Sequence, residues 1–308
     1  MEASITLKSL AKRNNTSIVL ADLSLGIENN STHALIGKNG SGKSTILRII
    51  AGIAEKDAGI VYLNGKDISI YPAETKQMVG YMPQYIDLDY DLSVLDNLLV
   101  FSTLFKISDK LAKKHILKFS DKFNFKNNLL DYPNTLSEGI LRAVQFTRSL
   151  IHDPDILLLD EPTKGMDPKS SMLLWNFIDR ISSHKTVLFA TQNFNEAEKY
   201  ADRISILHHG DIKMDGSLDK LIGAIQGLQK FEIRFSDNPD KNLLQQIRNI
   251  SSILKPELNG KTLGFYSNNR KDFFHVLKIA LDLKVSDIDM SLCRLLDLYL
   301  GLVDNGID

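Results

Sequence analysis

Residues Gly37 to Thr45 have the sequence GKNGSGKST. It follows the apolar segment THALI and precedes STILRIIAG, which has the spacing of an amphipathic helix. Gly37, Gly42, Lys43 and Ser44 fit the pattern G-x-x-x-x-G-K-[ST] between a strand and a helix. Glycines let backbone N–H groups approach phosphate oxygens, and the helix N-terminus adds partial positive charge. The sequence therefore predicts a phosphate-binding loop.

The side chains of this loop indicate how a nucleoside triphosphate and Mg²⁺ would be held. Lys43 is placed to neutralise the β- and γ-phosphates, and the hydroxyl of Ser44 is placed to ligate Mg²⁺. The residues expected to bind the nucleotide are Gly37, Asn39, Gly40, Ser41, Gly42, Lys43, Ser44 and Thr45.

A second motif, ILLLDEPTKGMDP from Ile156 to Pro168, narrows the chemistry. Its apolar residues predict a buried strand that ends in two carboxylates. Asp160 at the strand tip is suited to hold Mg²⁺ through a water. Glu161 beside it is suited to act as a general base on a water that attacks the γ-phosphate. Between the two motifs, LSEGI at 136–140 opens a helix and offers a second anion-friendly N-terminus.

Composition restricts the classes of function. The 308 residues carry a formal net charge of −1, which argues against a protein whose main role is to grip nucleic acid. A single cysteine, Cys293, fits a reducing compartment without a disulfide framework. The N-terminus lacks the pattern of a signal peptide, and no apolar run approaches the length of a bilayer span. We expect any membrane role to work through a partner.

Alternating strand and helix patterns over the first 220 residues predict an α/β fold with a largely parallel sheet covered by helices. Strands are expected at Ile5–Leu7, Ile18–Ile27, Thr32–Ile36, Gly59–Leu63, Ile156–Leu159, Thr186–Ala190 and Arg203–His208. Between Leu92 and Arg148 the spacing becomes helical, and Ser93 with Asp96 is expected to cap the first helix. The predicted fold class is a P-loop NTPase core over residues 1–222, with a helical subdomain at about 86–150.

Residues 229–308 are predicted to form a separate α+β accessory domain behind a linker, GAIQGLQK, at 223–230. The pattern is strand, helix, strand, strand, helix, strand and a closing helix, which is typical of a ferredoxin-like domain. Strands are expected at 230–235, 252–255, 262–266 and 285–290, and helices at 241–250, 271–283 and 292–303.

Together these motifs resemble the nucleotide-binding subunit of an ATP-binding cassette (ABC) transporter over about residues 4–220. GKNGSGKST resembles Walker A, ILLLDE resembles Walker B, and LSEGI resembles the signature Leu-Ser-Gly-Gly-Gln. KGMD resembles the D-loop with Asp167, and YMPQ resembles the Q-loop with Gln84. The resemblance implies ATP and Mg²⁺ as ligands, with Gln84 as a metal-contacting residue that couples to a membrane partner.

The resemblance also implies that two cassettes pair head to tail around ATP. Ser137 and Gly139 of one cassette would contact the γ-phosphate bound by Lys43 of the other, and Asp167 belongs to the same nucleotide-binding set. Closure on ATP and opening after hydrolysis would drive a transmembrane permease. The chain is then expected in the cytoplasm, peripheral on the inner face of the cell membrane, with no nucleic-acid partner.

Two further inferences concern the partner and the direction of transport. A groove beside Gln84, near Tyr85, Ile86 and Leu88, is expected to receive a coupling helix of the permease, unless those residues only pack internally. The segment SDIDMSLCRLLDLYLGL is loosely similar to the extension on cassettes of exporters whose permease is a separate chain. This favours export, and the alternative is a domain that only adds dimer contact.

The sequence departs from the family pattern at several positions. Gln192 stands where the family has its switch histidine. Glutamine offers an N–H donor but no positive charge, so we expect it to bind the γ-phosphate and slow the turnover. The alternative is that other groups position the water and Gln192 is merely tolerated. In the signature, Glu138 and Ile140 occupy the third and fifth positions, and Glu138 is expected to face solvent.

The third departure concerns the base. No Phe, Trp or Tyr precedes Tyr62, so adenine lacks the aromatic partner that the family supplies, and weak discrimination between ATP and GTP is expected. Arg13 could stack on the base instead, although an exposed arginine is the simpler interpretation.

The sequence thus predicts an ATPase subunit of an exporter, expected to be slow because of Gln192. A low-turnover half of a heterodimer and an ABC-type regulator without a permease are the alternatives.

Overall fold

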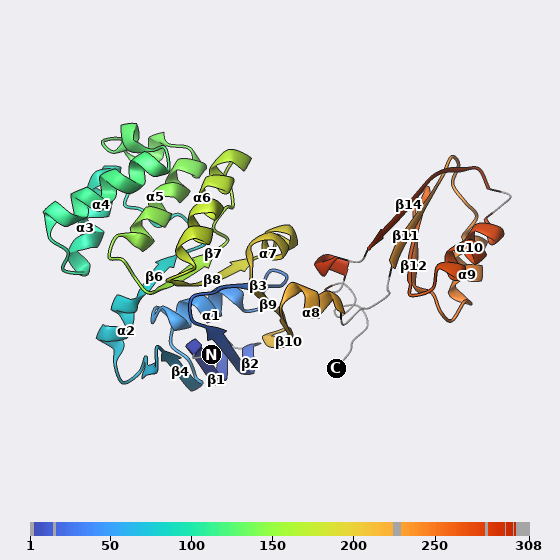
Figure 1. Ribbon diagram of the computed structural model, residues 1–308, viewed down its shortest axis with the longest axis horizontal. Helices are drawn as coiled ribbons and strands as arrows, with labels where there is room; N and C mark the ends of the chain where they lie inside the picture. Colours follow the sequence, from blue (N-terminus) through green and yellow to red (C-terminus); the bar gives the residue numbers. More distant parts are fainter. Residues whose placement is uncertain are drawn as a thin grey trace. The chain divides into compact units, whose positions relative to one another are not determined.

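The structure is a computed structural model that describes residues 3–14, 17–223, 229–280, 283–292, 294–297 and 299. The chain forms two compact units, residues 1–217 and 218–308 (Figure 1). Residues 224–228 of the predicted linker and half of the predicted closing helix at 292–303, including Cys293, lie outside the described residues. Of the helices within the described ranges, none has the length and apolar character that a membrane crossing requires.

A six-stranded sheet forms the centre of the first unit, in the order β10-β9-β3-β8-β7-β6. Its strands are β3 (Thr32–Ile36), β6 (Val79–Met82), β7 (Ile156–Asp160), β8 (Thr186–Thr191), β9 (Arg203–His208) and β10 (Asp211–Gly216). The strands from β9 to β6 pair in parallel, and β10 pairs antiparallel with β9. Every residue of β3, β7 and β8 is buried, as in sheets covered on both faces. The predicted largely parallel sheet is confirmed.

A second, antiparallel sheet was not predicted. It has the order β2-β1-β4-β5, with β1 (Ala3–Asn14), β2 (Ser17–Glu28), β4 (Ala58–Leu63) and β5 (Lys66–Asp67). The strands expected near Ile5, Ile18 and Gly59 therefore belong to this sheet and not to the parallel one. In β2, buried Leu23, Leu25 and Ile27 alternate with exposed residues, which is the pattern of a sheet with one solvated face. Its buried face packs on α1 (Lys43–Ile50) and the main sheet in one hydrophobic core.

Helices occupy the region between β6 and β7, as predicted. They are α3 (Val94–Leu104), α4 (Asp109–Lys122) and α5 (Glu138–Leu150), with short 3-10 turns at Lys126–Asn128 and Pro133–Thr135. Ser93 caps α3, because its hydroxyl accepts the N–H of Asp96 at 3.1 Å. These helices share a core of their own, separate from the core of the sheets. Two other helices of this unit, α6 (Pro168–Ile181) and α7 (Phe194–Tyr200), flank β8 in the sequence, and α2 (Pro72–Met78) precedes β6.

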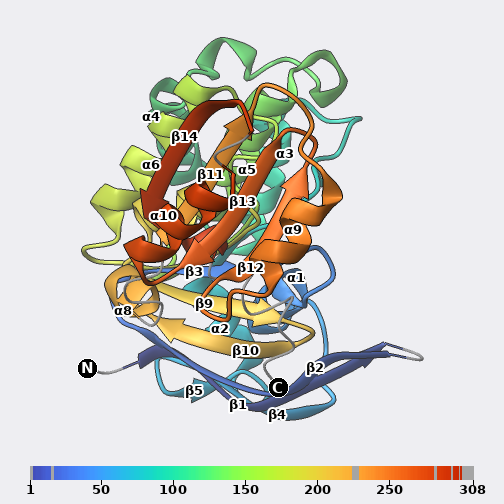
Figure 2. The ribbon, with the colours of Figure 1, turned by 90° about the vertical axis from the view of Figure 1, so that its right-hand side faces the viewer.

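The second unit contains α8 (Leu218–Gly223), β11 (Gln229–Phe235), α9 (Lys241–Arg248), β12 (Leu254–Asn259), β13 (Thr262–Ser267), α10 (Arg270–Ile279) and β14 (Val285–Leu292). Its four strands lie in the order β12-β13-β11-β14 and all pair antiparallel (Figure 2). The strand expected at 252–255 is present, but it begins and ends later, at Leu254–Asn259. A register irregularity between Leu254 and Glu257, with Lys255 at φ 48°, lets β12 continue past Pro256. The ferredoxin-like classification stays a prediction.

Candidate active site

The phosphate-binding loop lies between β3 and α1, and its glycines are required by the backbone. Gly40 and Gly42 have φ of 80° and 108°, in the left-handed region that favours glycine. A Cβ atom on Gly37 would lie 2.3 Å from the carbonyl oxygen of Leu207 and 2.7 Å from Oγ of Ser41. Larger side chains at these positions would therefore distort the loop. Its backbone forms a concave surface of the kind that binds phosphate.

The ammonium group of Lys43 is turned into this loop. Its Nζ donates hydrogen bonds to the carbonyl oxygens of Gly37 at 2.7 Å and Lys38 at 3.1 Å. Burial lowers the pKa of Lys43, while the nearby carboxylates of Glu161 and Asp160 oppose that shift. The cation is thus held inside the loop where anionic oxygens can replace the backbone carbonyls as its partners.

Asp160 ends β7 and is almost completely buried. Burial raises its pKa above the ordinary value, although a hydrogen bond from the hydroxyl of Ser44 opposes the rise. Among the described residues its Oδ1 atom has no hydrogen-bond partner. A buried carboxylate oxygen without a partner, next to a serine hydroxyl, fits a site for hydrated Mg²⁺. The described part of the chain contains no group of three or more His, Cys, Asp or Glu side chains that could by themselves hold a metal ion.

Glu161 and Gln192 meet at the ends of two adjacent strands. Glu161 follows β7 and has φ of 50°. This left-handed conformation is uncommon for glutamate, and residues that adopt it cluster at functional sites. The amide nitrogen of Gln192 donates to Oδ1 of Asn39 at 2.7 Å and to Oε1 of Glu161 at 3.1 Å. Gln192 thus joins the phosphate-binding loop to the predicted general base.

A cavity of about 300 Å³ brings most of the predicted site together. Gln84 and Glu161 line it together with every loop residue from Asn39 to Thr45. Asn14 and Val19 also line it, and the sequence did not predict them because the β1–β2 hairpin that carries them was not foreseen. The cavity therefore unites Walker A, the Q-loop and the acid of Walker B in one space.

Six predicted residues do not line this cavity. Three of them, Gly37, Asp160 and Gln192, each form a hydrogen bond with a residue that does. The other three lie at the starts of helices. Ser137 caps α5, where its hydroxyl accepts the N–H of Ile140 at 3.4 Å, and Gly139 lies in the first turn of the same helix. Asp167 caps α6 and accepts the hydroxyl of Ser170 at 2.5 Å and the N–H groups of Lys169 and Ser170 at 2.9 and 3.1 Å. The hydroxyl contact, followed by the backbone contacts, lowers the pKa of Asp167. Their role at a nucleotide stays a prediction that requires a second cassette.

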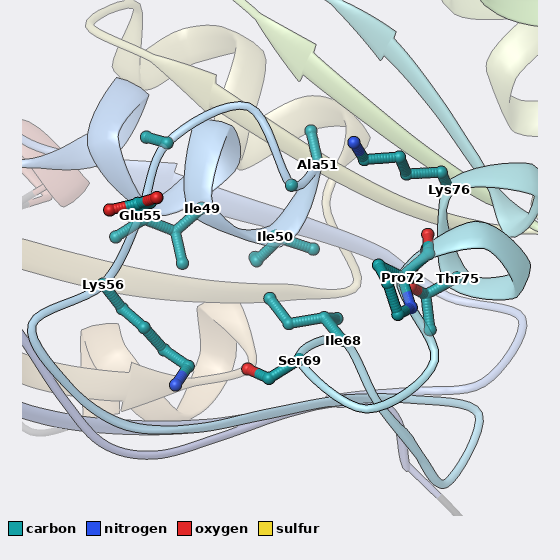
Figure 3. Close-up of a pocket in the computed structure, with 12 residues that line it drawn as sticks. Ile49, Ile50, Ala51, Glu55, Lys56, Ile68, Ser69, Pro72, Thr75 and Lys76 are labelled. Atoms are coloured by element: carbon teal, nitrogen blue, oxygen red, sulfur yellow. Dashed lines mark hydrogen bonds between the residues drawn. The ribbon is translucent and has the colours of Figure 1, made fainter.

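The residues expected to form a coupling groove do not share one environment. Tyr85 is 74% exposed, whereas Leu88 is buried in the core of the helical subdomain. Ile86 is partly buried and packs against the same core. The expectation that Leu88 lines an exposed groove is wrong, and the alternative of internal packing holds for it. A different cavity of about 390 Å³ lies between the end of α1 and α2, and Ile50 and Ile68 are among the residues that line it (Figure 3).

Comparison with known proteins agrees with this geometry. The family model described as ABC transporter matches residues 20–164. "Nod factor export ATP-binding protein I" of Burkholderia orbicola is 33% identical over 266 residues, which are 86% of this chain and 86% of that protein. The protein of the same name from Rhizobium sp. (strain N33) is 32% identical over 267 residues, with 86% of each chain covered.

Solved structures of ABC cassettes are similar to this chain. An "ATP binding subunit of ABC transporter" has a TM-score of 0.67 at 25% identity and covers 72% of this chain and 92% of its own. The dimeric bacterial ABC transporter cassette MJ0796 has a TM-score of 0.65 at 26% identity, with coverage of 70% and 98%. The chain therefore belongs to the ABC transporter family, as the ATP-binding subunit of such a transporter.

Proposed function

We propose that this subunit hydrolyses ATP in the cavity between Lys43 and Glu161 and thereby powers an exporter whose permease is a separate chain. The observation that carries the proposal is that one cavity unites a phosphate-binding loop, Gln84 and a carboxylate at a strand tip. Export is supported by the relatives named for Nod factor export, which align over 86% of the chain. The location that follows is the cytoplasmic face of the membrane, beside the permease.

The chain's own residues divide the chemistry among them. Lys43 neutralises charge on the terminal phosphates, and loop N–H groups orient them. Ser44, Gln84 and, through water, Asp160 would hold Mg²⁺, which supplies further neutralisation of the phosphate oxygens when bound. Glu161 accepts the proton of the attacking water. The hydrogen bond from Gln192 fixes the orientation of that carboxylate.

A glutamine at position 192 makes the turnover slow without abolishing it. Removing one aimed donor from such a site costs about 10²–10³ in rate, and a neutral donor in place of a cation costs less, roughly tenfold to a hundredfold. Gln192 still donates to Glu161, so the positioning part of the role remains. What is lost is the positive charge that a histidine can carry toward the γ-phosphate.

The signature residues require a second cassette. Ser137 and Gly139 at the start of α5, and Asp167 at the start of α6, lie outside the cavity that contains Lys43. We propose that a second cassette presents its own signature to this nucleotide. The pair is a homodimer if the second cassette is a copy of this chain, and a heterodimer if it is a different chain.

A second candidate function is the low-turnover half of a heterodimer, and Gln192 is the observation that favours it. Phosphate release by the purified chain, measured alone and then with its permease in lipid vesicles, separates the two. An ATPase subunit of an exporter releases phosphate alone and is stimulated by the permease. A nucleotide-binding half stays at background until a second, different cassette is added, and an ABC-type regulator is indifferent to the permease.

A further inference from the structure

One face of α5 carries three polar side chains that are buried although two of them are charged. Arg142, Gln145 and Arg148 are 2%, 0% and 9% exposed. Their spacing of three residues places them along one side of the helix. Buried arginines are costly unless they are paired and hydrogen-bonded, so their partners matter.

The partners are the segment that follows β6, residues 83–87, which we call the clamped segment. The guanidinium of Arg142 donates from Nη1 to the carbonyl oxygen of Pro83 at 3.1 Å and from Nη2 to that of Gln84. Gln145 donates from Nε2 to the carbonyl oxygen of Tyr85 at 2.8 Å. Three successive carbonyls of the Q-loop are therefore bound by side chains of α5.

Asp87 completes the attachment. Its carboxylate accepts Nε2 of Gln145 at 2.7 Å and pairs with Nη2 of Arg148, while its carbonyl accepts Nη1 of Arg148 at 3.1 Å. Hydrogen bonds from a charged donor are stronger than those between neutral groups, so moving the clamped segment away from α5 is costly. The Q-loop and α5 are thus fastened into one body.

The unusual glutamate of the signature supports this arrangement. Glu138 lies one helical turn before Arg142, with Oε1 3.8 Å from Nη2. Burial lowers the pKa of Arg142, and Glu138 provides the largest of the opposing charge interactions. Glu138 also lies against the D-loop, since a Cβ on Gly165 would be 2.3 Å from its Cδ atom. The side chain of Glu138 is 53% exposed. Glu138 nevertheless links the signature, to which it belongs, with the D-loop and with Arg142.

We propose that Arg142 is a positioning residue for Gln84, which it holds by the backbone so that the Q-loop moves only together with the signature helix. The proposal rests on the proposed role of Gln84 at Mg²⁺ and of Ser137 at a second nucleotide. Gln84 lines the nucleotide cavity, whereas Ser137 and Gly139 begin the helix that bears Arg142.

A double-mutant cycle tests this. Arg142→Met removes the hydrogen bonds but keeps much of the side-chain volume, Gln84→Ala removes the side chain that is positioned, and the double variant combines them. Arg142→Lys keeps the charge without the two-pronged donor and covers the case in which methionine prevents folding. Arg180→Met, at an exposed arginine near the end of α6, is the matched control.

The expected result is a loss of kcat of about tenfold in Arg142→Met, with the KM for ATP changed less than about threefold. In the Gln84→Ala background the same substitution should cost less than about twofold, because there is no side chain left to position. An equal loss in both backgrounds, or none in either, overturns the proposal. If Gln84→Ala is itself without effect, the proposed role of Gln84 fails.

Hydrogen exchange of the free protein decides the positioning independently of hydrolysis. The amides of residues 84–88 should exchange about tenfold faster in Arg142→Met, with a smaller increase in Arg142→Lys, and should be unchanged in Arg180→Met. Unchanged exchange in a folded Arg142→Met variant contradicts the proposal, whatever the ATPase rates show.

Discussion

The amide nitrogen of Gln192 lies 3.1 Å from Oε1 of Glu161, although the two residues are 31 positions apart in the sequence. They meet because β7 and β8 are neighbouring parallel strands, and each residue follows the carboxyl end of its strand. Gln192 also donates to Asn39 of the phosphate-binding loop at 2.7 Å. A neutral amide therefore stands at the junction of the two motifs on which hydrolysis depends.

Gln192→His should raise kcat by roughly tenfold to a hundredfold, because imidazole restores a group that can carry positive charge beside the γ-phosphate. Steady-state phosphate release at saturating Mg²⁺ and ATP measures this. Gln192→Ala is the companion variant, and its rate should fall below that of the wild type because Glu161 loses a donor. An identical rate in the wild type and Gln192→His would remove Gln192 from the account.

Gly37→Ala should distort the phosphate-binding loop. The new methyl group would lie 2.3 Å from the carbonyl oxygen of Leu207. Because that oxygen is a backbone atom, it cannot move away cheaply. Overpacking of this kind costs about 1–3 kcal/mol, so we expect a lower melting temperature together with weaker nucleotide binding. Gly26→Ala is the matched control, because a Cβ there meets nothing within 4 Å. Equal melting temperatures and nucleotide titrations for the two variants would contradict the geometry.

Acid should destabilise the protein through His33. Its ring is completely buried, with Nε2 2.7 Å from Oγ of Ser205, and burial lowers its pKa to about 4 despite the nearby Asp215. An unfolded histidine titrates near 6.5, so between about pH 6.5 and 4 the unfolded chain binds more protons than the folded one. The free energy of unfolding therefore falls as the pH falls through that range, by up to about 3 kcal/mol from this residue.

Urea unfolding at pH 7 and pH 5 measures this effect. His33→Gln should show a smaller difference between the two pH values than the wild type, while His209→Gln, at an exposed position, should behave as the wild type does. His152, whose pKa burial also lowers to about 4, leaves part of the pH dependence in both variants. An unchanged difference in His33→Gln would show that its ring does not control acid stability.

GTP should compete well with ATP. The described residues that line the nucleotide cavity include no aromatic side chain, and Asn14 and Val19 border it from the hairpin. An aromatic stack contributes about 0.5–1.5 kcal/mol, so its absence removes up to about tenfold of base-dependent affinity. The KM values for ATP and GTP should agree within about threefold. A preference for ATP greater than about thirtyfold would contradict this expectation.

Sequence patterns predicted the parts of the fold that depend on local chemistry. The loop at Gly37–Thr45 and the cap at Ser93 are local signals, and both lie where they were expected. The strand β6 was missed because it has only four residues and contains Gly80, which is small to suit its neighbours: a Cβ there would lie 2.0 Å from the carbonyl oxygen of Ser149. Such a requirement is visible only in three dimensions.

The functional site, too, could be predicted only where its residues form a local sequence motif. The residue types in Walker A and Walker B indicate their chemistry directly, so Lys43 and Glu161 could be singled out from the sequence. The hydrogen bonds from Arg142 join positions 58 and 59 residues apart, and the pairing of β1 with β4 that builds the second sheet spans a similar distance. No local pattern encodes such contacts, because they depend on which strands and helices become neighbours.

Hydrolysis in this cavity is expected to depend on Glu161 as the general base. The most direct test is phosphate release by the wild type and by Glu161→Gln, with ATP binding measured on the same samples. A positioned general base contributes about 10²–10⁴ in rate, so Glu161→Gln should bind ATP as the wild type does and release phosphate at least about a hundredfold more slowly. Equal rates of phosphate release in the two proteins would contradict the account.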